Sequence, residues 1–267
     1  MMGAIAGDVV GSVHEFNGTK MKDFRLIGPR NTFTDDTIMT AAVADALLTG
    51  EEIGKKMKEW GRMYPHPAGG YGHRFAMWLH GEDSKPYGSY GNGAAMRVSS
   101  TAWLAESEAD CVALARASAM PTHNHPEGIK GAEATAWTIW SARMGVAPET
   151  LREELARRYG YDLSRTCDEI RPEYCFDETC QGTCPQAFTA ALEAESFEDA
   201  LRLAVSLGGD ADTLAAIAGS IAEARFGVPK NLYGEILGYL DEPLRGAVVR
   251  FYDRLKEKGV FREAQDA

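Results

Sequence analysis

Gly208-Gly209-Asp210-Ala211-Asp212-Thr213 leads directly into the alanine-rich run Leu214-Ala215-Ala216-Ile217-Ala218-Gly219. The run predicts a closely packed helix, so the two aspartates stand at its N-terminus. Exposed backbone amides and the helix dipole stabilise carboxylates at this position. Two glycines followed by alternating acids are more typical of a place that holds cations or polar ligands than of hydrophobic core.

A second acidic cluster, Phe33-Thr34-Asp35-Asp36-Thr37, has the same design and also precedes an alanine-rich helix. Helix capping alone would explain one such residue. Two adjacent carboxylates flanked by two threonines exceed what capping needs, and a bound cation relieves their mutual repulsion most easily. We therefore expect folding to bring the two helix starts together.

Length and composition indicate an ordinary soluble globular protein. The 267 residues are 45% hydrophobic and 25% charged, with a net charge of −11. An acidic chain does not attract a phosphate backbone, which disfavours nucleic acid as a partner, although it does not exclude one. No apolar run approaches the roughly 20 residues that span a bilayer. We expect no membrane association and a cytoplasmic location.

Apolar residues recur at helical spacing, and the alternation typical of strands is almost absent. We predict an all-α fold in which residues 1–267 form one compact, orthogonal multi-helix domain, with 148–184 a polar insertion or flap. Gly3, Gly7 and Gly11 recur every four residues near the N-terminus. This spacing predicts a helix, ending near Glu15, with a glycine groove that another helix approaches closely.

The cysteines and histidines carry weaker signals. Four of the five cysteines lie between Cys167 and Cys184 without paired Cys-x-x-Cys spacing, which favours reduced thiols over structural zinc and leaves the role of this cluster open. Histidines 123 and 125 flank Asn124 in a proline-bounded loop, so they do not share a helix face. We interpret His123 as a hydrogen-bonding residue and His125 as structural.

Carboxylates and hydroxyls are hard oxygen ligands, which suit magnesium, manganese or calcium rather than zinc or copper. Four aspartates and at least two threonines in the acidic clusters can supply a two-metal centre. Glycine-rich loops at 69–72 and 88–93 can present backbone amides to a phosphate, although ordinary turns would look the same.

Six ordered motifs resemble the ADP-ribosylglycohydrolase family, including the dinitrogenase-reductase-activating glycohydrolase and the ADP-ribosylhydrolases. The resemblance spans about residues 3–227, and the motifs are Gly7-Asp8-x-x-Gly11-x-x-x-Glu15, Phe33-Thr34-Asp35-Asp36-Thr37, Gly70-Tyr71-Gly72, Gly88-Ser89-Tyr90-Gly91-Asn92-Gly93 with Met96-Arg97, Thr122-His123-x-x-Pro126 and Gly208-Gly209-Asp210-x-Asp212-Thr213. The resemblance implies an all-helical fold, two Mg²⁺ ions with Mn²⁺ as a possible substitute, and hydrolysis that releases ADP-ribose.

The resemblance also implies roles for individual residues. The expected metal ligands are Thr34, Asp35, Asp36, Asp210, Asp212 and Thr213. Glu15 and Asp36 are the expected catalytic carboxylates, with the choice of general base left open. The expected substrate-binding residues are Gly70, Tyr71, Gly72, Ser89, Tyr90, Gly91, Asn92, Gly93 and His123.

Two other functions fit the same residues. One is a magnesium-dependent phosphohydrolase of nucleotide diphosphates, and the other is a noncatalytic ADP-ribose-binding protein. Retention of all four aspartates weighs against the second. The acceptor joined to ADP-ribose stays open among arginine, serine, an acetyl ester, a nucleic-acid base and a small molecule, and the oligomeric state is also open.

Overall fold

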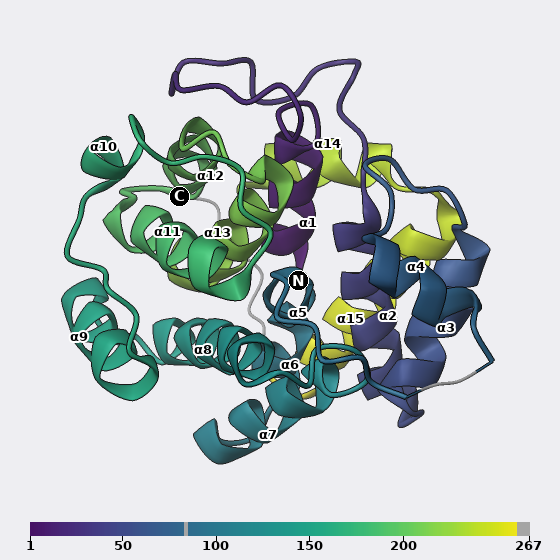
Figure 1. Cartoon of the computed structure of the whole chain (residues 1–267). Helices are drawn as coiled ribbons and strands as arrows, with labels where there is room; N and C mark the ends of the chain where they lie inside the picture. The colour runs from purple at the N-terminus through teal and green to yellow at the C-terminus, as the bar shows by residue number, and fades with distance from the viewer. Residues whose placement is uncertain (83–84, 261–267) are drawn as a thin grey trace.

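Regular secondary structure is helical throughout the computed structural model, which describes residues 1–82 and 85–260 (Figure 1). Within these ranges, strand-like pairing is limited to two isolated bridges, Thr34 with Ala68 and Gly91 with Thr179. The helices are α1 (Met2–Gly11), α2 (Asp35–Thr49), α3 (Ile53–Met63), α4 (His73–His80), α5 (Gly93–Met96), α6 (Ser99–Leu104), α7 (Glu108–Ala119), α8 (Pro126–Arg143), α9 (Pro148–Tyr159), α10 (Cys167–Ile170), α11 (Cys180–Glu193), α12 (Phe197–Ser206), α13 (Ala211–Phe226), α14 (Lys230–Tyr239) and α15 (Glu242–Glu257). The prediction of an all-α, single compact domain is confirmed.

The centre of the fold is the pair α1 and α13, which lie against each other in the middle of Figure 1. A Cβ atom on Gly7 would stand 2.0 Å from the Ala215 carbonyl oxygen, and one on Gly3 would stand 2.1 Å from the Gly219 carbonyl oxygen. The two backbones are therefore in direct contact, and the predicted glycine groove is confirmed. This contact brings the end of α1 beside the start of α13.

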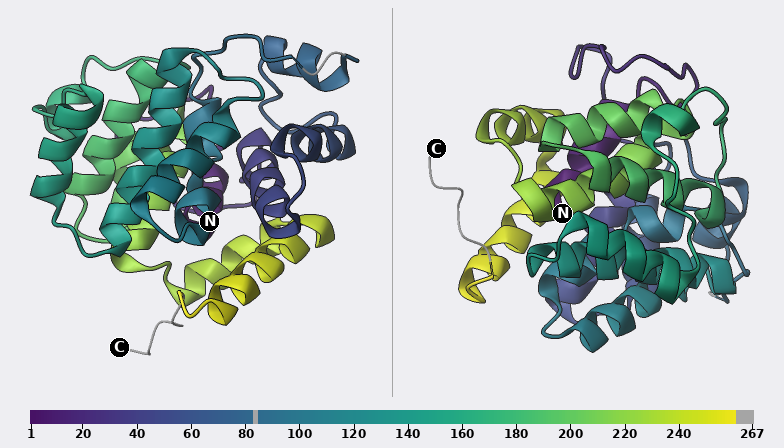
Figure 2. Two further views of the ribbon diagram at one scale, coloured as in Figure 1. Left: turned by 90° about the horizontal axis from the view of Figure 1, so that it is seen from below. Right: turned by 90° about the vertical axis from the view of Figure 1, so that its left-hand side faces the viewer.

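The remaining helices cover this pair from both sides. Helices α11 and α12 pack against α13, and α8 packs against α7, α9 and α11. On the other side, α2 contacts α1, α3 and α15. The C-terminal helices α14 and α15, yellow in Figure 2, lie on the outside of the molecule. Buried alanines fill much of α2, α8 and α13, so these helices approach one another closely.

Two helix boundaries differ from the sequence expectation. Helix α1 ends at Gly11, so Glu15 lies in the turn that follows rather than at the helix end. Helix α11 begins at Cys180, inside the segment 148–184 that we expected to be an insertion or flap, because the Thr179 hydroxyl accepts a hydrogen bond from the Gly182 amide and caps the helix there.

The polar segment 148–184 is not irregular, because it contains α9 and α10. Buried leucines at 151 and 155 attach α9 to the core, and Cys167 and Ile170 attach α10. Whether this segment is an insertion relative to related proteins stays a prediction. Across residues 1–82 and 85–260, no helix is both long and apolar enough to cross a membrane.

Candidate active site

A cleft of about 310 Å³ opens where the starts of α2, α5 and α13 meet the turn after α1. Its lining carries both signs of charge, since acids gather around the turn after α1 and the starts of α2 and α13, and two arginines, Arg74 and Arg97, line another part. The residues that line the cleft are Glu15, Asp35, Asp36, Met39, Gly70, Gly72, His73, Arg74, Phe75, Tyr87, Ser89, Gly91, Asn92, Gly93, Met96, Arg97, His123, Glu178, Asp210, Asp212 and Thr213.

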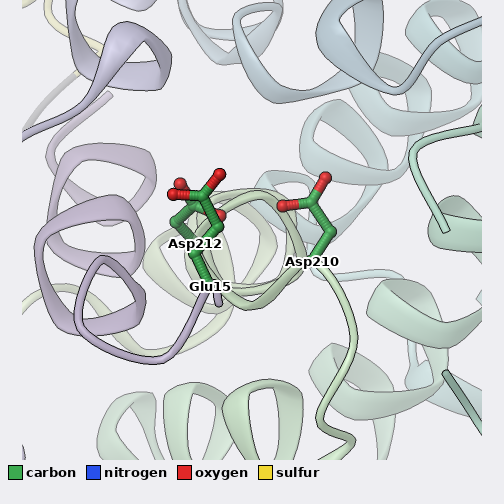
Figure 3. Close-up of side chains that lie close together, drawn as sticks. All are labelled: Glu15, Asp210 and Asp212. Atoms are coloured by element: carbon green, nitrogen blue, oxygen red, sulfur yellow. The ribbon is translucent and has the colours of Figure 1, made fainter. Parts of the chain in front are cut away.

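The acidic end brings together carboxylates from three distant segments. Glu15, Asp210 and Asp212 each offer an oxygen atom within 4.8 Å of the others, and their side chains point toward the same open space (Figure 3). Asp35 and Asp36 reach the same cleft from the first turn of α2. Folding therefore joins the two acidic clusters, as the sequence predicted.

Neutral donors orient two of these carboxylates. The Asn92 side-chain amide donates to Asp210 Oδ2 at 2.7 Å and to the Thr183 hydroxyl at 3.0 Å. The Thr213 hydroxyl donates to Asp36 Oδ2 at 3.0 Å, which links the start of α13 to the start of α2. Each of these two carboxylates keeps a second oxygen for a ligand.

Asp8, which we did not include among the expected site residues, holds the start of α2 in place. Its buried carboxylate accepts from the Thr34 amide at 3.0 Å, the Thr34 hydroxyl at 2.8 Å and the Thr37 amide at 3.0 Å. It also accepts a hydrogen bond from the Thr37 hydroxyl. In the sequence Asp8 stood out only as an acid inside the glycine-rich helix and as part of the motif Gly7-Asp8-x-x-Gly11, and neither signal identifies its partners.

The carboxylates repel one another in a site that is largely shielded from water. Burial, followed by the charges of Asp212 and Asp8, raises the pKa of Glu15 to about 8. Burial is also the largest cause that raises the pKa of Asp210 to about 6. The same two causes, burial and neighbouring acids, raise the pKa values of Asp35, Asp36 and Asp212 well above their usual range.

This donor set fits hard divalent cations. Among the residues that the structure describes, no ion pair joins a lysine or arginine to any of the five carboxylates that line the acidic end. A cluster of buried like charges without cationic partners is costly, and a cation lowers that cost. Carboxylate and hydroxyl oxygens are the ligands that magnesium and manganese prefer.

The opposite end of the cleft is basic. Arg97 is 1% exposed, and its Nη2 donates to the Thr122 hydroxyl at 2.9 Å and to the Ser118 carbonyl at 3.2 Å. Within the described residues its buried Nε has no hydrogen-bond partner. Arg74 lies over the Tyr87 ring with its guanidinium carbon 4.9 Å from the ring centre. Two guanidinium groups beside glycine loops are suited to an anionic ligand.

His123 lies between the basic end and the glycine loop. Its Nδ1 is 2.7 Å from the Thr122 hydroxyl, and its Nε2 lies close to Gly91 and Gly93. Burial, followed by the charges of Arg97 and Arg74, lowers its pKa well below the usual value. The hydrogen-bonding role of His123 agrees with the sequence interpretation.

Three expected site residues do not line the cleft. The Thr34 hydroxyl is engaged with Asp8 and also accepts from the Asp36 amide at 3.2 Å. The Tyr71 hydroxyl donates to the Tyr64 carbonyl at 3.0 Å. The Tyr90 ring lies 5.3 Å from the His125 ring and is 47% exposed. The motif spacing located the loops, but it did not say which side chains within them face the ligand.

Conversely, His73, Arg74, Arg97 and Glu178 line the cleft although none of them was among the expected site residues. Glu178 reaches the cleft because the Asn92 backbone amide donates to the Glu178 carbonyl at 2.7 Å and the Cys180 backbone amide donates to the Tyr90 carbonyl at 2.9 Å. These bonds hold the polar segment against the second glycine loop. Pairing between loops leaves no periodic pattern in the sequence.

Comparisons with known proteins agree with the fold. The chain is 26% identical to the ADP-ribosylhydrolase ARH3 of Xenopus tropicalis, covering 90% of this chain and 91% of that protein. It is 30% identical to the uncharacterized protein YegU of Escherichia coli, covering 74% and 73%. A solved structure titled ADP-ribosylglycohydrolase-related protein complex superposes with a TM-score of 0.73 at 26% identity, covering 94% of this chain and 95% of that one.

Residues 1–262 match the sequence profile described as ADP-ribosylglycohydrolase, which takes in every element of the cleft. The chain therefore belongs to the ADP-ribosylglycohydrolase family, and it is a hydrolase of the glycosyl bonds of ADP-ribose.

Proposed function

We propose that this enzyme is a magnesium-dependent hydrolase that releases ADP-ribose from an ADP-ribosylated protein or small molecule through a two-ion centre. The observation that carries the proposal is the convergence of Glu15, Asp210 and Asp212 with the two acids of α2 at one end of a cleft whose other end is basic. The diphosphate of ADP-ribose matches the basic end, and a ribose with vicinal hydroxyls matches an acidic end that holds cations.

The residues that would hold two Mg²⁺ ions, or Mn²⁺ in their place, are Asp35, Asp36, Asp210, Asp212 and Thr213. When bound, the ions would neutralise these carboxylates and supply Lewis-acid binding of the ribose hydroxyls. Thr34 is part of the proposed ligand set: its hydroxyl donates its proton to Asp8 and accepts one hydrogen bond from the Asp36 amide, which leaves one lone pair for an ion.

Glu15 is the better placed of the two candidate bases. The Asp36 carboxylate is fixed by the Thr213 hydroxyl, whereas within the described residues the Glu15 carboxylate accepts no hydrogen bond. Glu15 is also partly exposed, on the turn after α1, where water has access. We propose that Glu15 accepts the proton of the attacking water and that Asp36 orients the site.

Hydrolysis breaks the bond between the ribose anomeric carbon and the acceptor atom. Water adds its hydroxyl to the anomeric carbon, and its proton passes through the carboxylate to the leaving group. Positive charge develops on the ribose ring during this step, and the surrounding carboxylates favour that charge. A cytoplasmic location is part of the proposal, supported by five cysteines that are all unpaired.

Replacement of Asp210 or Asp36 tests the ion centre. We expect Asp210→Ala and Asp36→Ala each to lower magnesium-dependent release of ADP-ribose by more than about 100-fold, since even residues that only orient metal ligands are often worth 10- to 100-fold. Release is measured by chromatography on defined ADP-ribosyl linkages, with magnesium present and chelated, and circular dichroism monitors folding.

Asp253→Ala, an exposed acid on α15, is the matched control and should keep wild-type turnover. Unchanged turnover in either site variant would contradict the two-ion assignment. Products also separate the alternatives, because AMP and ribose phosphate from ADP-ribose itself would indicate a phosphohydrolase. Tight ADP-ribose binding without turnover of any linkage would indicate a binding protein.

A further inference from the structure

A second hollow of about 370 Å³ adjoins the acidic end of the cleft. It is lined by Glu15, Phe16, Gly18, Phe176, Gly208 and Gly209. Glu15 is the one residue that lines both spaces, so the hollow borders the acidic end and not the arginines. The Glu15 side chain therefore stands at the border between the cleft and the hollow.

Two phenylalanine rings form the apolar part of the hollow. Phe16 is 70% exposed and Phe176 is 47% exposed. Their rings are stacked with centres 6.4 Å apart and an interplanar angle of 25°. Two large apolar rings held together in water at the edge of an active site are costly to leave uncovered, and such patches mark binding surfaces.

The two rings come from separate segments that other residues hold in place. Lys20, four residues beyond Phe16, donates to the Tyr174 carbonyl at 2.6 Å and to the Leu207 carbonyl at 2.5 Å. The Tyr174 hydroxyl donates to the Gly182 carbonyl at 3.2 Å. The segment after α1, the segment before α11 and the end of α12 are thus joined beneath the ring pair, which is ready for a ligand without rearrangement.

The position of the pair identifies the part of the substrate that it meets. If the diphosphate lies at the basic end and the ribose at the acidic end, the group on the far side of the anomeric carbon lies beyond Glu15. That group is the acceptor, which becomes the leaving group when the bond is cut. With ADP-ribose placed in this way in the main cleft, the second hollow lies on the acceptor side, beyond the shared residue Glu15.

We propose that Phe16 and Phe176 bind the leaving group and prefer a flat, delocalised group to an aliphatic alcohol. This inference rests on the function proposed above. Aromatic faces stack on a guanidinium or on a nucleobase, which share a flat π-system. An aliphatic hydroxyl, such as that of serine, offers no such face. The pair is thus a specificity determinant of the hydrolysis.

Substitutions that distinguish the effect of the aromatic ring from that of apolar side-chain volume test the proposal. Phe16→Leu and Phe176→Leu keep apolar volume but remove the ring, whereas Phe16→Tyr keeps the ring. Each variant and the wild type are assayed with magnesium on three compounds in which ADP-ribose is linked to a guanidine, a nucleobase or serine. The distant exposed residue Val249, 53% exposed on α15, provides the control Val249→Ala.

We expect the leucine variants to lower kcat/KM by about 5- to 10-fold on the guanidine-linked or nucleobase-linked compound, chiefly through KM, as loss of one aromatic stacking contact predicts. The serine-linked compound should change less than about twofold, and Phe16→Tyr should keep wild-type selectivity. Loss on only one flat compound identifies whether a guanidinium or a base is the group bound.

An equal loss on all three compounds would overturn the proposal, because the rings would then act only by holding the two segments together. No loss on any compound would overturn it as well, while leaving the ADP-ribose-releasing function intact. If the wild type releases ADP-ribose from none of the compounds, the proposed function fails, and the assignment of the rings fails with it.

Discussion

At the scale of the residue, the hydrogen bonds separate helix capping from ligand binding. The Thr34 hydroxyl caps α2, so Asp35 and Asp36 are not needed for that purpose. Asp210 occupies the cap position of α13 but makes no capping bond, and its carboxylate instead accepts from Asn92. Acids that stand at a helix start without capping it are available for a ligand.

Asp8 gives the first prediction at this scale. Asp8→Ala would leave the buried amides of Thr34 and Thr37 without an acceptor, which we expect to lower the free energy of unfolding by about 3 kcal/mol or more. Because these amides set the first turn of α2, the folded variant should also lose ADP-ribose release. Urea unfolding and turnover per folded molecule measure the two effects.

Asp45→Ala is the matched control for this prediction. Asp45 is a buried acid on the same helix, accepts a hydrogen bond from Trp60 Nε1 at 3.1 Å and does not line the cleft. It should destabilise the protein without lowering turnover per folded molecule. If Asp8→Ala behaves in the same way, Asp8 stabilises the fold but does not position the site.

At the scale of the element, the contact between α1 and α13 decides where the site forms. A Cβ on Gly11 would stand 2.4 Å from the Asp212 Cα atom, so the last turn of α1 touches the first turn of α13. Any increase in their separation would move Glu15 away from Asp212. The glycines of α1 therefore link packing in the core to the geometry of the cleft.

Gly7→Ala tests this link. The new methyl group would stand 2.0 Å from a backbone oxygen of α13, which cannot rotate away, so the helices must separate. We expect the free energy of unfolding to fall by more than about 3 kcal/mol, at or above the upper end of typical overpacking costs. Urea unfolding provides the measurement.

Gly234→Ala is the corresponding control, because Gly234 lies in exposed α14 with nothing within 4 Å of the added Cβ. There alanine should stabilise the protein by about 1 kcal/mol through helix propensity alone. A similar small stabilisation in Gly7→Ala would show that α1 and α13 are not in backbone contact.

The same element scale shows what the sequence could and could not predict. Glycine spacing predicted the α1 groove, and the two acid clusters predicted the starts of α2 and α13, because both signals are local. Helix α9 was read as irregular because its polar face dominates, and Leu151 and Leu155 alone bury it. Asp8 and Glu178 were missed because their roles depend on contacts between distant segments, which no local pattern records.

At the scale of the whole molecule, charge is divided between surface and cleft. Several acids on the surface are paired with a basic side chain, as Glu51 is with Lys56 and Glu154 with Arg158. Asp36, Asp210 and Asp212 of the cleft are buried and make no such pairs among the described residues, so the folded state carries an electrostatic cost there. Cation binding would lower the repulsion between these carboxylates and would therefore stabilise the entire domain.

Magnesium should therefore raise the melting temperature of the protein in the absence of any substrate. A ligand at 100 times its dissociation constant stabilises the native state by about 2.7 kcal/mol. For a chain of this size, about 2–4 °C per kcal/mol gives an expected increase of roughly 5–10 °C. Differential scanning fluorimetry in chelator and in magnesium measures this increase in melting temperature.

The double variant Asp210→Ala/Asp212→Ala removes two of the carboxylates, and magnesium should raise its melting temperature by less than half as much as that of the wild type. An equal increase in both proteins would mean that magnesium stabilises the domain elsewhere, and the acidic end of the cleft would lose its assignment as the cation site.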